Sequence, residues 1–342
     1  MEDMDNLNWE DFSPTPADPG ELKMIQKSIR KRHWLTVLTS VVLVAVLIFG
    51  AVQYGIPALE SRYWDPTTST YAEHTSDLEF AMIAHSELFV PRYNVNALDI
   101  SKHGFAAHDL SILCFNEKNS NEWSYYSGSL VQNELNLPFG LWDYTNIGFY
   151  NCGSIKNAKD ILKQLPNYVK VQANVSFPED LDMYQITELQ NWMTDYEYAK
   201  YKSVDAENKI NWVAIRTHED LYSAYPLCGM KPFTLTFATN LKGKINEYYP
   251  YFSNQYYSKS NLEDHFLSLL EYSADQVDNG TGILPDIEKV DANIYRNILD
   301  YVNENGIYSF GCTITATPEM LLEMIELDKF STVLIQDIWI GF

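Results

Sequence analysis

The most constraining feature of the sequence is an uncharged, apolar stretch of 21 residues from Trp34 to Tyr54. At about 1.5 Å of rise per residue, a helix of this length matches the roughly 30 Å hydrocarbon core of a bilayer. Trp34 and Tyr54 stand at its two ends, where aromatic rings favour the headgroup region. We therefore predict a transmembrane helix over residues 34–54.

Two alternatives fit this stretch less well. The apolar region of a cleaved signal peptide is usually only about 7 to 15 residues long, and no A-x-A-like cleavage site follows Phe49. A core helix of this length without a polar face is rarer still in soluble folds.

Charge on the two sides of the stretch predicts its orientation. Five basic residues precede it within a dozen positions: Lys23, Lys27, Arg30, Lys31 and Arg32. The positive-inside rule places this side in the cytoplasm. Residues 1–33 hold 5 basic and 7 acidic side chains, whereas residues 55–342 hold 19 and 39, a net charge of -20. We expect a single-pass protein of the cell membrane with a cytoplasmic N-terminus and an extracytoplasmic C-terminal region. We also expect no direct contact with nucleic acid, because phosphate binding needs clustered Lys and Arg.

The short cytoplasmic tail has two parts. Asp18, Pro19 and Glu21 form a helix start, and Leu22, Ile25 and Ile29 then recur at helical spacing, so the basic helix is expected to run unbroken into the span. The preceding segment mixes acids with aromatic residues, among them Trp9 and Phe12, and is typical of a segment that folds in a partner's groove. A solvated leader without a partner is the alternative. The candidate partner-binding residues are Trp9, Phe12, Leu22, Ile25 and Ile29.

The outer region has an expected α+β organisation in three parts. Residues 55–74 form a Pro- and Thr-rich linker. Residues 75–165 are predicted to be mainly β, with strands at 78–85, 109–115, 123–131 and 146–152 and a helix at 154–165. Residues 166–342 are predicted to alternate strands and helices. The predicted strands are 168–177, 210–217, 307–317 and 332–340. The predicted helices begin at Pro178, after Thr217 and at Pro318, and two more span 261–273 and 290–306.

No catalytic or metal-binding motif is found in the sequence. The zinc-protease, serine-hydrolase and nucleotide-binding signatures are missing, so we expect no enzyme activity and no cofactor. His103 and His108 lack the spacing of a metal pair on one helix face. Asp275, Asp278 and Asn279 lack the oxygen spacing of a calcium loop, so a surface turn is expected there.

Two further residue groups leave alternatives open. Cys114, Cys152, Cys228 and Cys312 all lie outside and allow three full disulfide pairings or four buried thiols. A tyrosine-rich loop could form an outer ligand surface, or cover the edge of the core with its hydroxyls in water. Its tyrosines are Tyr248, Tyr249, Tyr251, Tyr256 and Tyr257.

The last 50 residues resemble the C-terminal end of the sigma factor regulator family of Gram-positive bacteria. The similar features are the helix ending at Asn305-Gly306, the strand to Thr315, the helix start at Thr317-Pro318 and a closing strand that holds Trp339. The basic helix running into a single span also agrees. The resemblance implies a membrane anti-sigma factor, or its accessory subunit, that controls an extracytoplasmic-function sigma factor while its outer domain senses the envelope.

One departure from the family separates two functions. Anti-sigma members usually carry a longer cytoplasmic segment, and only 33 residues are available here. Two functions are therefore expected as alternatives. In the first, the chain regulates a sigma factor, alone, as a homo-oligomer or with a membrane co-regulator. In the second, it is a membrane-anchored binding protein for a wall polymer or protein partner. The signal and the identity of the sigma factor do not follow from the sequence.

Overall fold

The computed structural model describes residues 19–70, 75–91, 93–116, 123–137, 153–201, 208–219, 227–232, 259–279, 283 and 293–340. The chain divides into two compact units, Met1–Arg62 and Tyr63–Phe342.

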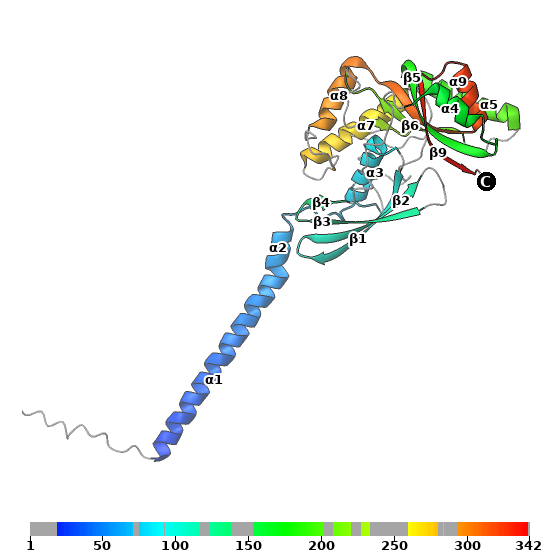
Figure 1. Cartoon of the computed structure of the whole chain (residues 1–342). Coiled ribbons are helices and arrows are strands. Elements are labelled where there is room, and N and C mark those ends of the chain that lie inside the picture. The colour runs from blue at the N-terminus through cyan, green and yellow to red at the C-terminus, as the bar shows by residue number, and fades with distance from the viewer. Residues whose placement is uncertain are drawn as a thin grey trace, which may run out of the picture. The chain divides into compact units, whose positions relative to one another are not determined.

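The first unit is helical throughout its described part. Helix α1 (Pro19–Gly50) runs unbroken through the basic segment into the apolar stretch, as predicted, and continues through a π-helical turn, η2 (Ala51–Gly55), into α2 (Ile56–Glu60) (Figure 1). The Thr36 hydroxyl donates a hydrogen bond to Arg32 O, and the Thr39 hydroxyl donates one to Leu35 O, both at 2.9 Å. No polar side chain in the apolar stretch therefore breaks the helix, and among the described residues Pro19–Glu60 is the helix long and apolar enough to cross a membrane.

The second unit contains two antiparallel sheets. The first has the order β1-β2-β3-β4, a meander of β1 (Tyr93–Gly104), β2 (Ala107–Asn116), β3 (Trp123–Val131) and β4 (Glu134–Asn136). On β2, buried Leu110, Ile112 and Cys114 alternate with more exposed neighbours, which gives the sheet one core face.

The second sheet has the order β7-β6-β8-β5-β9. Its strands are β5 (Val169–Asp182), β6 (Lys209–Ile215), β7 (Gly229–Met230), β8 (Tyr308–Ala316) and β9 (Thr332–Ile340). Central β8 is buried from Ser309 to Ala316. The associated helices are α4 (Ile155–Leu162), α5 (Met183–Tyr201), α7 (Lys259–Asp278), α8 (Ile294–Asn305) and α9 (Pro318–Glu326). This mixture of helices and antiparallel sheets agrees with the predicted α+β class.

The predicted strand at 78–85 is wrong, because this segment lies within helix α3 (Asp77–Phe89). Ser76 caps the helix by accepting a hydrogen bond from the Glu79 amide at 3.1 Å. The helix packs against β1, β7 and α7. Every residue from Leu78 to Phe89 except Glu79 is buried, including the polar His85, Ser86 and Glu87, so the helix lacks the exposed polar face by which a helix is recognised in sequence.

The predicted helix start at Pro178 is also wrong. Strand β5 continues to Asp182, and α5 begins at Met183. Asp182 and Gln185 form a reciprocal cap: the Gln185 amide donates to Asp182 Oδ1 at 2.8 Å, and the Asp182 amide donates to Gln185 Oε1 at 2.9 Å. Pro178 is tolerated because pairing of β5 with β8 is interrupted between Ser176 and Leu181.

Several other predicted elements are confirmed. Strands β3 and β9 have the predicted bounds, and α4 begins after Ser154, which accepts from the Asn157 amide. Thr317 caps α9 by accepting from the Met320 amide at 3.3 Å, with Pro318 in the first turn. The strand at 146–152 lies outside the described residues, as does most of the helix expected after Thr217.

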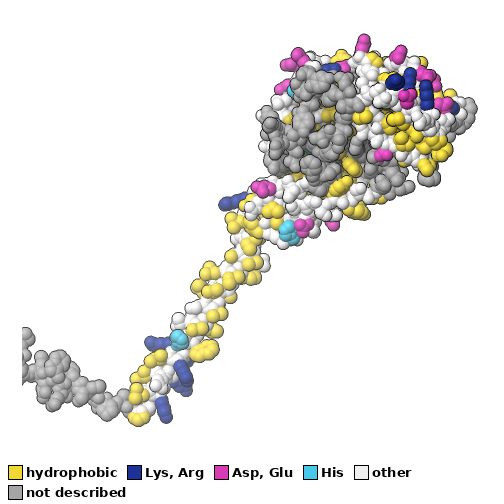
Figure 2. Space-filling model, viewed as in Figure 1, with side chains coloured by type: hydrophobic (Ala, Val, Ile, Leu, Met, Phe, Trp, Pro, Cys, Tyr) yellow, Lys and Arg dark blue, Asp and Glu magenta, His cyan; other side chains and the backbone are white. Residues whose placement is uncertain are grey.

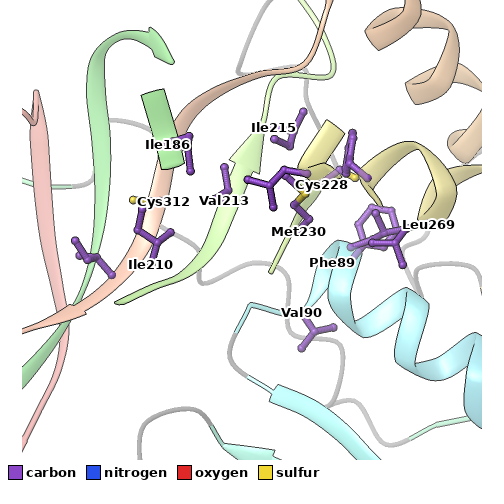
Figure 3. Close-up of a cluster of buried hydrophobic side chains, with 14 of the residues drawn as sticks. Phe89, Val90, Ile186, Ile210, Val213, Ile215, Cys228, Met230, Leu269 and Cys312 are labelled. Atoms are coloured by element: carbon purple, nitrogen blue, oxygen red, sulfur yellow. The ribbon is translucent and has the colours of Figure 1, made fainter. Parts of the chain in front are cut away.

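One large cluster of buried apolar side chains joins both sheets and α3. Figure 3 shows Phe89 of α3 and Val90, which follows it, with Leu269 of α7, beside side chains from the second sheet. The second sheet contributes Val213, Ile215, Met230 and Cys312, and Cys228 precedes β7. Close packing is tightest at Gly229, where an added Cβ would lie 2.1 Å from Val213 O and 2.3 Å from the Trp212 ring.

Candidate functional site

A pocket of about 510 Å³ lies beside the first half of α5. Its apolar lining comes from Phe177, Leu181, Leu189 and Trp192, and its polar lining includes Glu179, Gln185, Glu188, Asp328 and Lys329. The volume falls in the range of small-ligand sites, about 300–1,000 Å³. We name this feature the Trp192 pocket.

The interruption of β5 creates the pocket. Between Ser176 and Leu181, residues 177–180 of β5 have no pairing partner on β8, and this segment lines the pocket together with the loop that follows α9. Ser331 ties that loop down: its amide donates to Ser176 O at 2.8 Å and its hydroxyl to Phe177 O at 3.0 Å. These hydrogen bonds hold one wall of the pocket in place.

The rim of the pocket is acidic. Glu179, Glu188 and Asp328 are exposed, and none forms an ion pair with a described residue. Glu188 accepts a hydrogen bond from the Tyr184 hydroxyl, which raises the pKa of that tyrosine. Against three carboxylates stands one cation of the lining, Lys329, so the pocket favours positive charge.

Asp328 occupies a position that usually belongs to glycine. Its φ is 52°, and it ends α9 in a Schellman arrangement: its amide donates to Ile325 O at 3.2 Å, and the Lys329 amide donates to Met324 O at 3.0 Å. The carbonyl end of a helix carries partial negative charge. The carboxylate of Asp328 and the C-terminal end of α9 therefore both place negative charge at the rim of the pocket.

A second notable group is a carboxylate–histidine pair in the core. Glu87 Oε1 lies 2.6 Å from His265 Nε2, and the two side chains are 0% and 2% exposed. Trp212 Nε1 donates to the Glu87 backbone carbonyl at 2.9 Å, and Glu87 Oε2 has no hydrogen-bond partner among the described residues. Because the pair is sealed from solvent, its geometry fits a structural role between α3 and α7 rather than contact with a substrate.

His85 lies two residues before Glu87, on nearly the opposite side of α3, and is also buried. Its Nδ1 is 2.9 Å from the Tyr295 hydroxyl, which donates to Ile283 O at 2.6 Å. Because the hydroxyl proton points to Ile283, Nδ1 of His85 carries the hydrogen toward Tyr295. Burial lowers the pKa of His85 to about 3, so the ring is neutral.

The structure places only part of the predicted partner-binding set. Leu22, Ile25 and Ile29 lie on α1 and are 48%, 53% and 60% exposed, so about half of each apolar residue remains accessible. Trp34 and Tyr54 lie at the two ends of the apolar stretch and are exposed as well. Trp9 and Phe12 lie outside the described residues, as do all five tyrosines of the predicted outer ligand surface, from Tyr248 to Tyr257.

Other residues considered from the sequence have ordinary surroundings. His103 Nδ1 is 3.1 Å from Asp109 Oδ2, and His108 is buried. Among the described residues no group of three or more His, Cys, Asp or Glu could hold a metal ion.

The predicted surface turn at Asp275 and Asp278 is wrong. Both residues belong to the end of α7, where Arg296 of α8 pairs with them, at 3.7 Å from Asp275 Oδ1 and in closer contact with Asp278. These carboxylates therefore join two helices and do not form a cation loop.

Cys114, Cys228 and Cys312 are buried free thiols. Desolvation raises the pKa of Cys114 to about 12 and raises the pKa of Cys228 and Cys312 as well. These cysteines act as small apolar core residues, which excludes a disulfide among these three; Cys152 lies outside the described residues.

Sequence reasoning missed the Trp192 pocket. Phe177 and Trp192 fall in a strand and a helix that the sequence predicts without any sign of a pocket. The local signal in the sequence is that α9 ends without a glycine, at Asp328. Comparison of the chain with protein-family models, curated proteins and solved structures finds no match.

Proposed function

We propose that the chain is a single-pass membrane regulator that couples an extracytoplasmic α+β domain to a short cytoplasmic tail, and that the tail controls an extracytoplasmic-function sigma factor. The observation that carries this proposal is α1. None of its residues is buried, and its apolar side chains from Trp34 to Phe49 are 44% to 70% exposed. Soluble proteins rarely expose an apolar surface of this size, and a bilayer would remove it from water.

The distribution of side chains along α1 supports the proposed orientation. Figure 2 shows hydrophobic side chains along the helix and Lys and Arg gathered near its N-terminal end. The positive-inside rule assigns that end to the cytoplasm. The acidic α+β unit, which follows the span in sequence, then lies outside.

The tail has one exposed apolar stripe that suits a protein partner. Leu22, Ile25 and Ile29 share one helix face, and their neighbours on the remaining faces are mostly Lys, Arg and Gln. An amphipathic helix of this kind docks into an apolar groove. The family resemblance identifies the expected partner as a sigma factor.

Purification from native membranes tests this function. The full-length protein should retain a sigma factor, identified by mass spectrometry, and a version lacking residues 2–20 should lose it. Ile25→Glu should weaken retention, because it places a charge in the docking face. Ser28→Glu is the matched control, since it adds the same charge about a quarter-turn away from that face. Retention that is equal in all four proteins, or no sigma factor in any of them, would contradict the regulator function.

A second function is favoured by the Trp192 pocket. A preformed pocket in the outer unit suits a membrane-anchored binding protein for an extracytoplasmic ligand, with the tail serving only as an anchor. In that case no sigma factor is retained, and removal of residues 2–20 leaves ligand binding unchanged.

A further inference from the structure

We propose that the Trp192 pocket binds a basic peptide, with one Arg or Lys side chain held between the carboxylate rim and Trp192. The inference rests on the proposed function only in placing this pocket outside the membrane. Its physical basis is the charge of the rim, the apolar floor and the shape of the loop after α9.

Charge complementarity selects a cation. Asp180, the neighbour of Glu179, is already neutralised by Arg216, whose Nη2 lies 2.8 Å from Asp180 Oδ1. Glu179, Glu188 and Asp328 have no such partner among the described residues. A cation entering the pocket therefore does not have to displace an ion pair with a described residue, and it would share the pocket with Lys329 of the lining.

The apolar floor selects a peptide over a simple ion. A lone ammonium or metal ion would leave most of the roughly 510 Å³ unfilled, and Phe177, Leu181 and Leu189 would gain nothing from it. A basic side chain with an apolar neighbour fills both parts. Arg suits the site best, because its planar guanidinium can bind a carboxylate in bidentate fashion and stack on an indole.

Asp328 points to the same conclusion. Glycine would hold its left-handed conformation without strain, yet the chain has a carboxylate there. The side chain contributes to the acidic rim at the expense of local stability. Residues that keep such strain are often found at binding sites.

The test uses the full-length protein in nonionic detergent micelles and two labelled peptides, acetyl-Gly-Arg-Leu-Arg-Gly-amide and the same peptide with citrulline in place of arginine. Citrulline has the shape of arginine without its charge. Fluorescence anisotropy, with empty micelles as the blank, should show binding of the arginine peptide and at least tenfold weaker binding of the citrulline peptide.

Variants then locate the binding. The isosteric double variant Glu188→Gln/Asp328→Asn should weaken binding about five- to thirtyfold, as expected for the loss of two exposed charge contacts. Trp192→Leu should weaken it as well. The control Asp300→Asn/Glu304→Gln removes the same charge from the exposed face of α8 and should change affinity less than twofold.

Three results would overturn the proposal: equal binding of both peptides, equal losses in the pocket and α8 variants, or no binding of the arginine peptide at millimolar concentration. Equal losses would mean that the net charge of the unit attracts the peptide without a site. Asp328→Gly adds an independent check, because it should weaken binding while stabilising the fold. None of these measurements requires a sigma factor, so this proposal can fail while the regulator function stands, and the reverse.

Discussion

Buried His85 should make the second unit lose stability in mild acid. Its pKa is about 3 in the folded protein against an ordinary value of 6.5. Above pH 6.5 both the folded and unfolded states hold a neutral ring, so stability is complete. Below that pH the ring binds a proton in the unfolded state but stays neutral in the folded state. Each further pH unit therefore lowers the free energy of unfolding by up to about 1.4 kcal/mol until the pH reaches 3. Between pH 7 and pH 5 the loss amounts to about 2 kcal/mol.

Urea unfolding of the full-length protein in micelles, followed by tryptophan fluorescence at pH 7, 6 and 5, measures this loss. His85→Asn is the matched variant, because its amide nitrogen can replace Nδ1 as the donor to Tyr295 and cannot ionise in this range. The variant should lose about 2 kcal/mol less than the native protein over this interval. An identical acid loss in the two proteins would refute the reasoning.

Three further predictions concern stability and insertion. Glu87→Leu should destabilise the fold by about 3–5 kcal/mol in urea unfolding, because it removes the buried carboxylate that contacts His265; the double variant with His265→Leu should recover part of the loss. Gly229→Ala should prevent a native near-ultraviolet circular dichroism spectrum, since its Cβ would overlap Val213 O and the Trp212 ring. Val44→Arg should reduce membrane insertion by about 2.5–3.5 kcal/mol, measured by alkaline extraction of membranes, and normal insertion would argue against the span.

Much of the fold follows from local sequence signals. Thr317-Pro318 and Ser154 mark the starts of two helices, and strand-like runs between polar turns mark β3 and β9 with the observed bounds. These signals work because capping and strand propensity depend on residues only a few positions apart.

The wrong assignments have a common cause in distant packing. Helix α3 reads as a strand because its partners β1, β7 and α7 bury it on all sides and remove its polar face. Strand β5 continues through Pro178 because that residue lies in the interruption of pairing with β8, where no amide donor is needed. The sequence of α3 or β5 alone does not show which elements pack or pair with it.

The candidate site was even less accessible from sequence. The Trp192 pocket joins residues 177–192 with Asp328 and Lys329, which are more than 130 positions further along the chain. Only the antiparallel pairing of β5 with β9 and the anchoring of Ser331 bring the two segments together.

The sequence by itself determines the helix of 34–54, the basic residues before it and the acidic balance after it, because these are properties of consecutive residues and of composition. The tertiary structure decides which charges remain available. Glu179 and Asp180 are adjacent and chemically alike, yet Asp180 is neutralised by Arg216 while Glu179 lines the Trp192 pocket. Their difference arises from neighbours that are distant in sequence, because Arg216 is 36 positions from Asp180 and Asp328 is still further along the chain, and only the fold brings them to these residues.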